Sequence, residues 1–363
     1  MTPPIPRRVA IAASIFVLLG VIAYFAYQRW NEIGSSDRDT VLAGMPTDAT
    51  AVLYADVAEL RPSPFVSDLY AWVPQREPDA DYSQFVRETG FDYERDLNRV
   101  AVALTRQGPD TEFLAIADGR FDQTKIVATT LKFGSRENRG SRHIFFVPAT
   151  STARRISFTF LRRERIALSD DSDLDALLSK SPAGEDARAW RERFKRLAGS
   201  PLFAVIRQDG ATAGSITSRA PGGFQSPQLS ALLDQLQWIT IAGRPEGNEL
   251  RVVMEGESTS DSTVRQLADL LNGVLMMAQA GLNGPRTRRQ LDPLARDAYL
   301  EMLRGADVSH IDRGETKSVR VVFNVTPKFL AAVRSARPIL PAPPAPPETE
   351  SPSPKARAQK SHK

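Results

Sequence analysis

The sequence lacks cysteine entirely and has only three histidines in 363 residues. The absence of thiols excludes disulfides, thiolate catalysis, cysteine-bound zinc and iron–sulfur clusters. His143 and His310 fall in separate predicted strands and His362 lies near the C-terminus, so none has a companion at the spacing of metal ligands. We therefore expect structural or solvated histidines, and we expect neither a metal nor a cofactor.

Short catalytic and nucleotide-binding motifs are missing as well. The chain has no His-Glu-x-x-His, no Gly-x-Ser-x-Gly, no Gly-x-x-x-x-Gly-Lys and no Gly-x-Gly-x-x-Gly. The acidic run from Ser169 to Asp175 has the alternate aspartates of an EF-hand loop, but Ala176 and Pro182 replace the required glycine and glutamate. Its aspartates and serines are typical of a helix N-cap instead. We predict no catalytic residues, although carboxylates brought together from distant segments would leave no local signature.

Strong charge of one sign is also absent, since 47 Lys and Arg face 43 Asp and Glu, a formal net charge of +4. A nucleic-acid partner is therefore not favoured. Arginines nevertheless cluster at predicted strand ends in the first half of the body, where two-pronged guanidinium contacts could bind phosphate or carboxylate. The alternative is that they are solvated and paired with nearby acids such as Glu137 and Glu164. This candidate anionic-ligand patch consists of Arg136, Arg139, Arg142, Arg154, Arg155, Arg162, Arg163 and Arg165.

One long uncharged run is present near the N-terminus. From Val9 to Tyr27 the chain has 19 residues without a charge. At about 1.5 Å per residue, a helix of this length matches the ~30 Å hydrocarbon core of a bilayer. We predict a transmembrane signal anchor over residues 9–28. Arg7 and Arg8 precede the run, so residues 1–8 are expected in the cytoplasm and the body outside it.

A cleavable signal peptide is the alternative to an anchor. Cleavage requires small residues one and three positions before the cut. A cut after Ala26 would place the bulky Tyr24 at the third position. The uncleaved anchor is therefore favoured, which implies a single-pass protein of the inner membrane with the N-terminus inside and the C-terminus outside.

The rest of the chain divides into two similar folded segments and two polar connections. Residues 29–45 are expected to form a polar stalk, and residues 46–182 a first α+β lobe. A charged helix over residues 183–199 leads into a second α+β lobe over residues 200–337. Residues 338–363 are rich in proline and end in basic residues, so we expect an extended, disordered tail.

Both lobes show the order strand, helix, strand, strand, helix, strands, helix. Opening strands are predicted at Thr50 to Asp56 and at Leu202 to Arg207. The helix predicted at Gln290 to Leu303 would be an insertion in the second copy, and a long helix from Asp261 to Ala280 is expected to bury its apolar stripe, with the Met276-Met277 pair in the core or at a lobe interface. The predicted fold is therefore α+β, with one transmembrane helix followed by two tandem, similar lobes of mainly antiparallel sheet covered by helices.

Two motifs carry a resemblance to a known family. The run Thr89-Gly-Phe-Asp-Tyr-Glu-Arg-Asp-Leu-Asn-Arg-Val-Ala-Val-Ala-Leu104 follows an opening Asp48-Ala-Thr-Ala-Val-Leu-Tyr-Ala-Asp56. Together they resemble a bacterial domain-of-unknown-function family of exported or membrane-anchored proteins with a duplicated α+β unit. The resemblance implies an envelope location and no reaction, and it assigns no site residue.

These observations predict a non-catalytic, membrane-anchored binding or scaffolding protein of the bacterial envelope. Its expected partners are the lipid bilayer, contacted through the N-terminal helix, and other envelope proteins or anionic envelope polymers. Two alternatives remain open from the sequence. One is an envelope hydrolase that uses spatially assembled carboxylates, and the other is a carrier of lipids or small molecules.

We predict that the full-length protein stays in the membrane fraction after an alkaline carbonate wash. The uncharged run is long enough to span the bilayer, and its exit is a poor cleavage site. Immunoblotting of the washed membranes gives the measurement. Mass spectrometry that found a mature N-terminus near Tyr27 would contradict the anchor.

Overall fold

The computed structural model describes residues 35–72, 80–107, 110–148, 155–170, 173–179, 184–208 and 227–335. The predicted anchor over residues 9–28 and the proline-rich tail over residues 338–363 lie outside these ranges. Within them, no helix combines the length and apolar character needed to cross a bilayer. The anchor and the tail therefore remain predictions.

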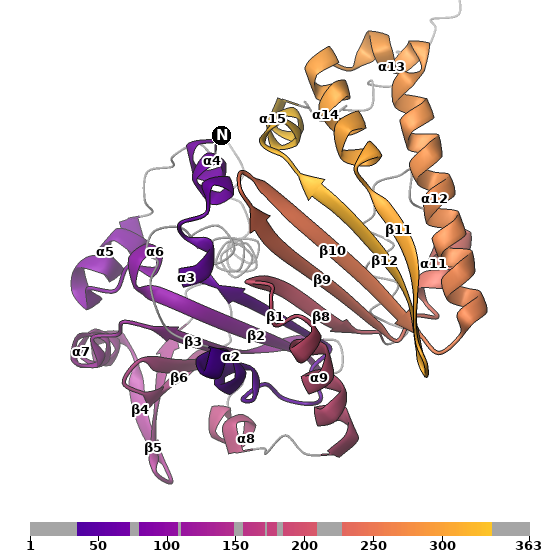
Figure 1. The fold of residues 1–363 in the computed structure, drawn as a ribbon. Coiled ribbons are helices and arrows are strands. Elements are labelled where there is room, and N and C mark those ends of the chain that lie inside the picture. Colours follow the sequence, from indigo (N-terminus) through magenta and orange to yellow (C-terminus); the bar gives the residue numbers. More distant parts are fainter. Residues whose placement is uncertain are drawn as a thin grey trace, which may run out of the picture.

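The described strands form a single antiparallel sheet (Figure 1), in the order β11-β12-β10-β9-β8-β1-β2-β3-β7-β6-β5-β4. The predicted α+β class with an antiparallel sheet and covering helices is confirmed. The strands are β1 (Ala51–Asp56), β2 (Leu97–Gln107), β3 (Asp110–Gly119), β4 (Ser135–Arg139), β5 (Arg142–Pro148), β6 (Arg155–Arg162), β7 (Arg165–Ser169), β8 (Leu202–Arg207), β9 (Trp238–Glu246), β10 (Glu249–Ser258), β11 (Asp307–Arg313) and β12 (Thr316–Val325).

The two halves of the chain contribute the two halves of this sheet. The first half is ordered β1-β2-β3-β7-β6-β5-β4 and the second β8-β9-β10-β12-β11. In each half, the third strand therefore pairs with the last strand, and the last strand pairs with the one before it in sequence. The first strands of the halves, β1 and β8, pair with each other and make the sheet continuous. The repeated sequence pattern predicts two lobes but does not indicate that their first strands pair.

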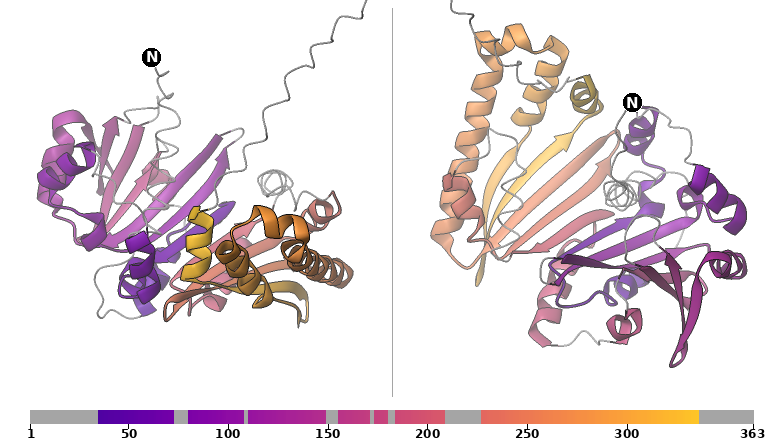
Figure 2. Two further views of the ribbon diagram at one scale, coloured as in Figure 1. Left: turned by 90° about the horizontal axis from the view of Figure 1, so that it is seen from above. Right: turned by 180° about the vertical axis from the view of Figure 1, so that it is seen from behind.

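Thirteen helices are described, and they lie against the sheet or beyond its ends (Figures 1 and 2). They are α2 (Ser35–Leu42), α3 (Val57–Leu60), α4 (Pro64–Trp72), α5 (Ala80–Thr89), α6 (Tyr93–Asp96), α7 (Gln123–Phe133), α8 (Leu174–Ser179), α9 (Gly184–Arg196), α11 (Pro227–Leu233), α12 (Asp261–Asn283), α13 (Pro285–Gln290), α14 (Pro293–Arg304) and α15 (Pro327–Ser335).

Alternate side chains of β1 define two faces of the sheet, which we call the Tyr54 face and the Leu53 face. On the Tyr54 face, Tyr54 and Phe203 stack with ring centroids 5.0 Å apart, and α2, α8 and α9 pack over the core around them. On the Leu53 face, a core over the first half includes residues of α3 and α7, and a separate core under α11 and α12 covers the second half. The helices on the Leu53 face therefore belong to two groups.

The segment predicted as a stalk is in part packed structure. Residues 35–42 form α2, and Val41, Leu42 and Met45 are buried in the largest core, on the Tyr54 face. The sequence of α2 is mostly polar, so its few apolar residues gave no periodic signal. The packed body therefore begins before residue 46.

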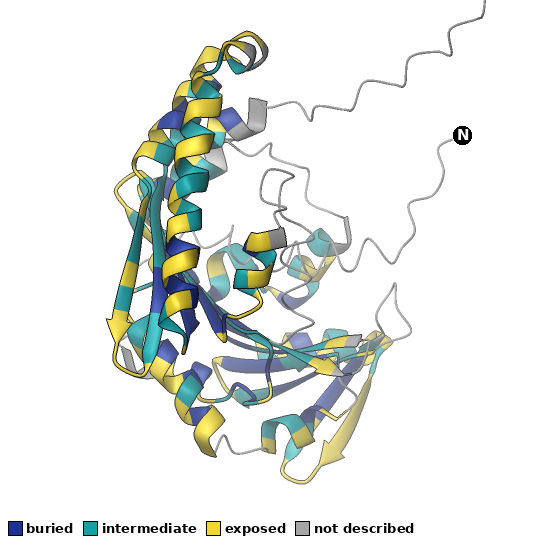
Figure 3. Cartoon of the chain, turned by 90° about the vertical axis from the view of Figure 1, so that its right-hand side faces the viewer, coloured by how far each residue is buried: buried dark blue, intermediate teal, exposed yellow. Residues whose placement is uncertain are grey.

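Three further details differ from the sequence analysis. The stripe of α12 is fully buried only between Thr263 and Ala268, and Met276 and Met277 are 66% and 67% exposed at its far end (Figure 3). The core or lobe-interface position expected for this methionine pair is therefore wrong. The helix expected from Gln290 begins instead at Pro293, after the separate α13. Strand β4 was not predicted because all its residues are exposed and mostly polar.

We predict that Leu42→Ala lowers the free energy of unfolding by about 2–5 kcal/mol, because a buried leucine loses its transfer energy and leaves a cavity. Leu42 is 4% exposed, whereas Leu294, the control, is 81% exposed. Leu294→Ala should change stability by no more than about 0.5 kcal/mol. Urea unfolding followed by circular dichroism measures both. Equal effects of the two substitutions would show that α2 does not belong to the folded body.

Candidate functional site

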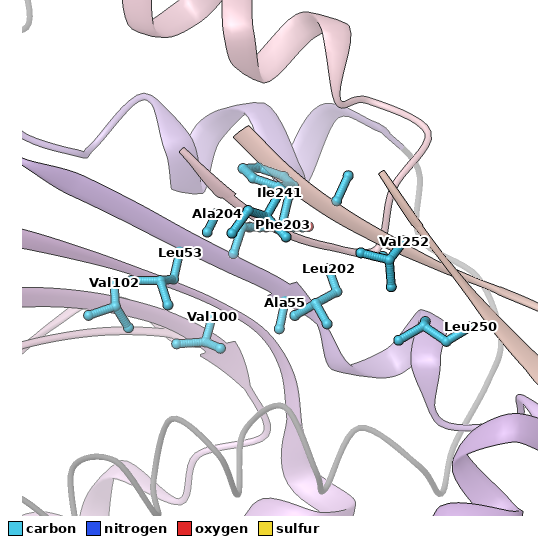
Figure 4. A pocket seen from close by; sticks show the side chains of 13 residues that line it. Leu53, Ala55, Val100, Val102, Leu202, Phe203, Ala204, Ile241, Leu250 and Val252 are labelled. Carbon is cyan, nitrogen blue, oxygen red and sulfur yellow. The ribbon is translucent and has the colours of Figure 1, made fainter. Parts of the chain in front are cut away.

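An apolar hollow on the Leu53 face lies where the two halves of the sheet join (Figure 4). We call it the central trough, and its volume is about 250 Å³. Its side chains come from the adjacent strands β2, β1, β8, β9 and β10, between the two groups of helices. The lining consists of Leu53, Tyr54, Ala55, Val100, Val102, Leu202, Phe203, Ala204, Ile241, Ala242, Gly243, Leu250 and Val252.

Strand register explains why these residues meet. Across β1 and β8, Leu53 lies opposite Ala204 and Ala55 lies opposite Leu202. Small residues at this junction leave space above the sheet. Gly243 also leaves space above the sheet. A Cβ at this position would lie 3.5 Å from the side chains of Leu202 and Leu250, which is an ordinary van der Waals distance.

The trough offers burial without acid–base chemistry. The side chains of Tyr54, Phe203 and Ala242 belong to the core on the opposite face, so the side chains that enter the trough are aliphatic. Leu53, Ala204 and several of their neighbours are only half-buried, and no residue of the lining is charged. A concave, aliphatic surface without polar anchors binds ligands by the removal of apolar area from water.

Two glutamates of β10 lie close together on the opposite face from the trough. Glu255 and Glu257 point to the Tyr54 face of β10, and both are ion-paired with arginines. Burial would raise the pKa of Glu255, but hydrogen bonds from Arg313 and Ser318 outweigh it and hold that pKa below its usual value. Glu255 is therefore ionised at neutral pH and is not suited to donate a proton.

The structure does not bring the predicted arginine patch together as one surface. Arg155 and Arg162 are at opposite ends of β6. Arg142 donates to Asp175 at 2.6 Å, and Arg139 donates to Glu137 at 3.0 Å. Arg136, Arg155, Arg162 and Arg163 are exposed, and Arg154 lies outside the described residues.

Arg165 has a structural position that the sequence did not reveal. Its side chain is 9% exposed, and its Nε and Nη2 donate to the two carboxylate oxygens of Asp118 at 2.6 and 2.8 Å. The two residues lie directly opposite each other across β3 and β7. Arg165 is therefore part of a buried ion pair and is not available to an external ligand.

The remaining candidates from the sequence are accounted for locally. The His143 ring lies 2.7 Å from the Asn138 side chain, and His310 lies 3.1 Å from Asp261. Asp173 accepts a hydrogen bond from the Ala176 amide at the start of α8, as an N-cap does. Within the described ranges, no group of three or more His, Asp or Glu could hold a metal ion.

Comparisons with known proteins give a distant structural likeness. No protein-family model and no curated protein matches the sequence. Crystal form I of TP0453 aligns with a TM-score of 0.41 at 11% identity, over 81% of this chain and 94% of that chain. Crystal form III aligns with a TM-score of 0.43 at 11% identity, over 81% of this chain and 96% of that one. At such scores the likeness establishes no shared function.

We predict that Arg165→Met destabilises the protein by about 3–5 kcal/mol, because it removes the two hydrogen bonds of a buried ion pair with Asp118. Arg139→Met is the matched control, since its ion pair with Glu137 is nearly half exposed. That control should cost less than about 1 kcal/mol. Denaturant unfolding measures both variants. A stable Arg165→Met variant would contradict the structural role of this arginine.

Proposed function

We propose that the protein is a non-catalytic binding protein of the bacterial envelope, anchored by its N-terminal helix, whose central trough holds an aliphatic chain. The aliphatic lining of the trough is the observation that carries this proposal. Its half-buried leucines and alanines would gain about 25 cal/mol for each Å² of apolar area that a ligand removes from water. The anchor supports it, since a bilayer-bound protein works beside a store of acyl chains.

The dimensions and chemistry of the trough favour a flexible aliphatic ligand. It extends over five neighbouring strands, which at about 4.8 Å between strands corresponds to roughly 19 Å. Its side chains include no aromatic ring on the Leu53 face, and aromatic rings would be the usual partners of a flat, conjugated ligand. An acyl chain requires only length and apolar contact, which the trough supplies.

We infer further that the two halves are copies of one α+β unit, as the sequence pattern predicts. The orders β1-β2-β3-β7-β6 and β8-β9-β10-β12-β11 correspond strand for strand. An acid faces an arginine at matching places in both, with Asp118 opposite Arg165 and Glu255 opposite Arg320. On this basis, the trough is a site created by the junction of two copies and is not present in either copy alone.

We predict that the full-length protein in nanodiscs is labelled by a photoactivatable fatty acid within β1, β2 or β8 to β10, and that Ala204→Phe reduces this labelling at least tenfold. The added ring would occupy the trough. Ala231→Phe is the control, because Ala231 is exposed on α11, away from the trough. Mass spectrometry of the labelled peptides gives the sites, and circular dichroism confirms that both variants fold.

Labelling confined to the N-terminal anchor would overturn the proposed function, since the bilayer alone would account for it. Unchanged labelling of the trough strands in Ala204→Phe would also overturn it.

A further inference from the structure

The Tyr54 face of the second half carries a cluster of charged side chains unrelated to the trough. Four arginines surround two glutamates there, and we call this group the arginine cluster. Arg193 and Arg196 come from the last turn of α9, whereas the other two come from the edge strand β11 and its neighbour β12. The cluster consists of Arg193, Arg196, Glu255, Glu257, Arg313 and Arg320.

Glu257 fixes helix α9 to the sheet. Its side chain is 1% exposed, and Arg193 donates to its Oε2 at 2.5 Å while Arg196 donates to its Oε1. The Arg193 guanidinium also lies 4.0 Å from the centre of the Trp238 ring. Burial lowers the pKa of Arg193, and the charge of Glu257 opposes this effect.

Glu255 contacts the remaining arginines. Arg313 donates to both of its carboxylate oxygens, and Arg320 donates to Oε2 at 3.1 Å. Arg196 approaches Oε1 of the same carboxylate at 3.5 Å. The hydrogen bond from Arg313 to Glu255 raises the pKa of the Arg313 guanidinium above its ordinary value, although the side chain is partly buried. The four arginine side chains therefore surround two carboxylates.

The cluster has more positive charge than its ion pairs need. Four arginines contact two glutamates, and Glu192 of α9 acts on Arg193 and Arg313 as a further negative charge, so the group keeps an excess of one positive charge. The matching place in the first half has one acid for each arginine, because Arg165 donates to Asp118 and the neighbouring Arg99 donates to Asp56. Uncompensated cations in a partly buried site repel each other and lose hydration, so the excess is costly unless an anion joins them.

Free hydrogen-bond donors and space accompany this excess. Among the described residues, the Nε atoms of Arg193, Arg196 and Arg320 are buried and have no hydrogen-bond partner. The cluster borders a cavity of about 420 Å³. A second hollow of about 340 Å³ lies along β9 and β10, and its charged lining residues are Arg196, Arg244, Arg251 and Glu246, the last two 3.9 Å apart.

We propose that the arginine cluster is a binding site for a phosphate monoester. A phosphate monoester carries about −1.5 to −2 charges near neutral pH and would compensate the excess positive charge of the cluster. Its three terminal oxygens accept hydrogen bonds from several planar guanidinium forks at once. Arg313 and Arg320 are the more exposed members, at 28% and 37%, and stand at the mouth of the site. The site lies on the opposite face of the sheet from the trough, so an experiment that contradicts one of the two proposals leaves the other unaffected.

The test is a titration of the full-length protein in phosphatidylcholine nanodiscs at low salt. Glycerol 3-phosphate represents a free monoester, and nanodiscs that contain phosphatidic acid present the same group on a lipid. We expect glycerol 3-phosphate to bind, measured by calorimetry, and to raise the melting temperature. Binding to phosphatidic acid but not to glycerol 3-phosphate would identify a lipid headgroup as the source of the phosphate group.

The variant Arg320→Met should weaken binding at least tenfold and abolish the rise in melting temperature. Without ligand, its melting temperature should equal or exceed that of the wild type, because one repelling cation is gone; a purely structural arginine would give a fall. Arg139→Met, which removes an exposed arginine of the first half, should bind normally. Absence of binding to both probes, equal binding by Arg320→Met and the wild type, or a fall in the ligand-free melting temperature of Arg320→Met would overturn the proposal.

Discussion

The pairing of β1 with β8 is the interaction on which the rest of the structure depends. Five residue pairs from Ala51↔Ile206 to Ala55↔Leu202 join segments about 150 residues apart. Both strands are apolar on both faces, as expected for strands in the middle of a covered sheet. The stacked rings of Tyr54 and Phe203 reinforce the same junction on one face. Without this ladder, each half would expose its first strand as an open edge.

The junction also explains why the two faces differ in chemistry. On the Tyr54 face, α2 and α9 cover the join, and the last turn of α9 reaches the charged residues of β10. On the Leu53 face, the core that includes α3 and α7 and the core under α11 and α12 lie on either side of the join, and α4 of the first half contacts β9 and β10 of the second. One pairing thus produces an aliphatic hollow on one side and a basic cavity on the other.

Local sequence patterns predicted where individual strands and helices lie in the chain better than they predicted which elements contact each other. Alternation located β1 and β8 within a residue, because strand periodicity depends only on the local sequence. It gave no sign that the two would pair. Arg165 was assigned to a surface patch because its partner Asp118 lies 47 positions earlier in the chain. The arginine cluster had a visible signal, since Glu255 and Glu257 alternate directly after the apolar run Val252-Val-Met254, but only the fold showed which arginines contact them.

The two outermost strands affect how this protein behaves at high concentration. An open antiparallel sheet has two unpaired edges, and each is a template on which another chain could continue the ladder. In the described part of the chain the edges are β4, with the sequence Ser-Arg-Glu-Asn-Arg, and β11, which carries Asp307, Asp312 and Arg313. If a second molecule paired its own edge strand with β4 or β11, the charged side chains of the two molecules would face each other. The sheet can therefore be long and continuous within one chain and still resist growth into fibrils.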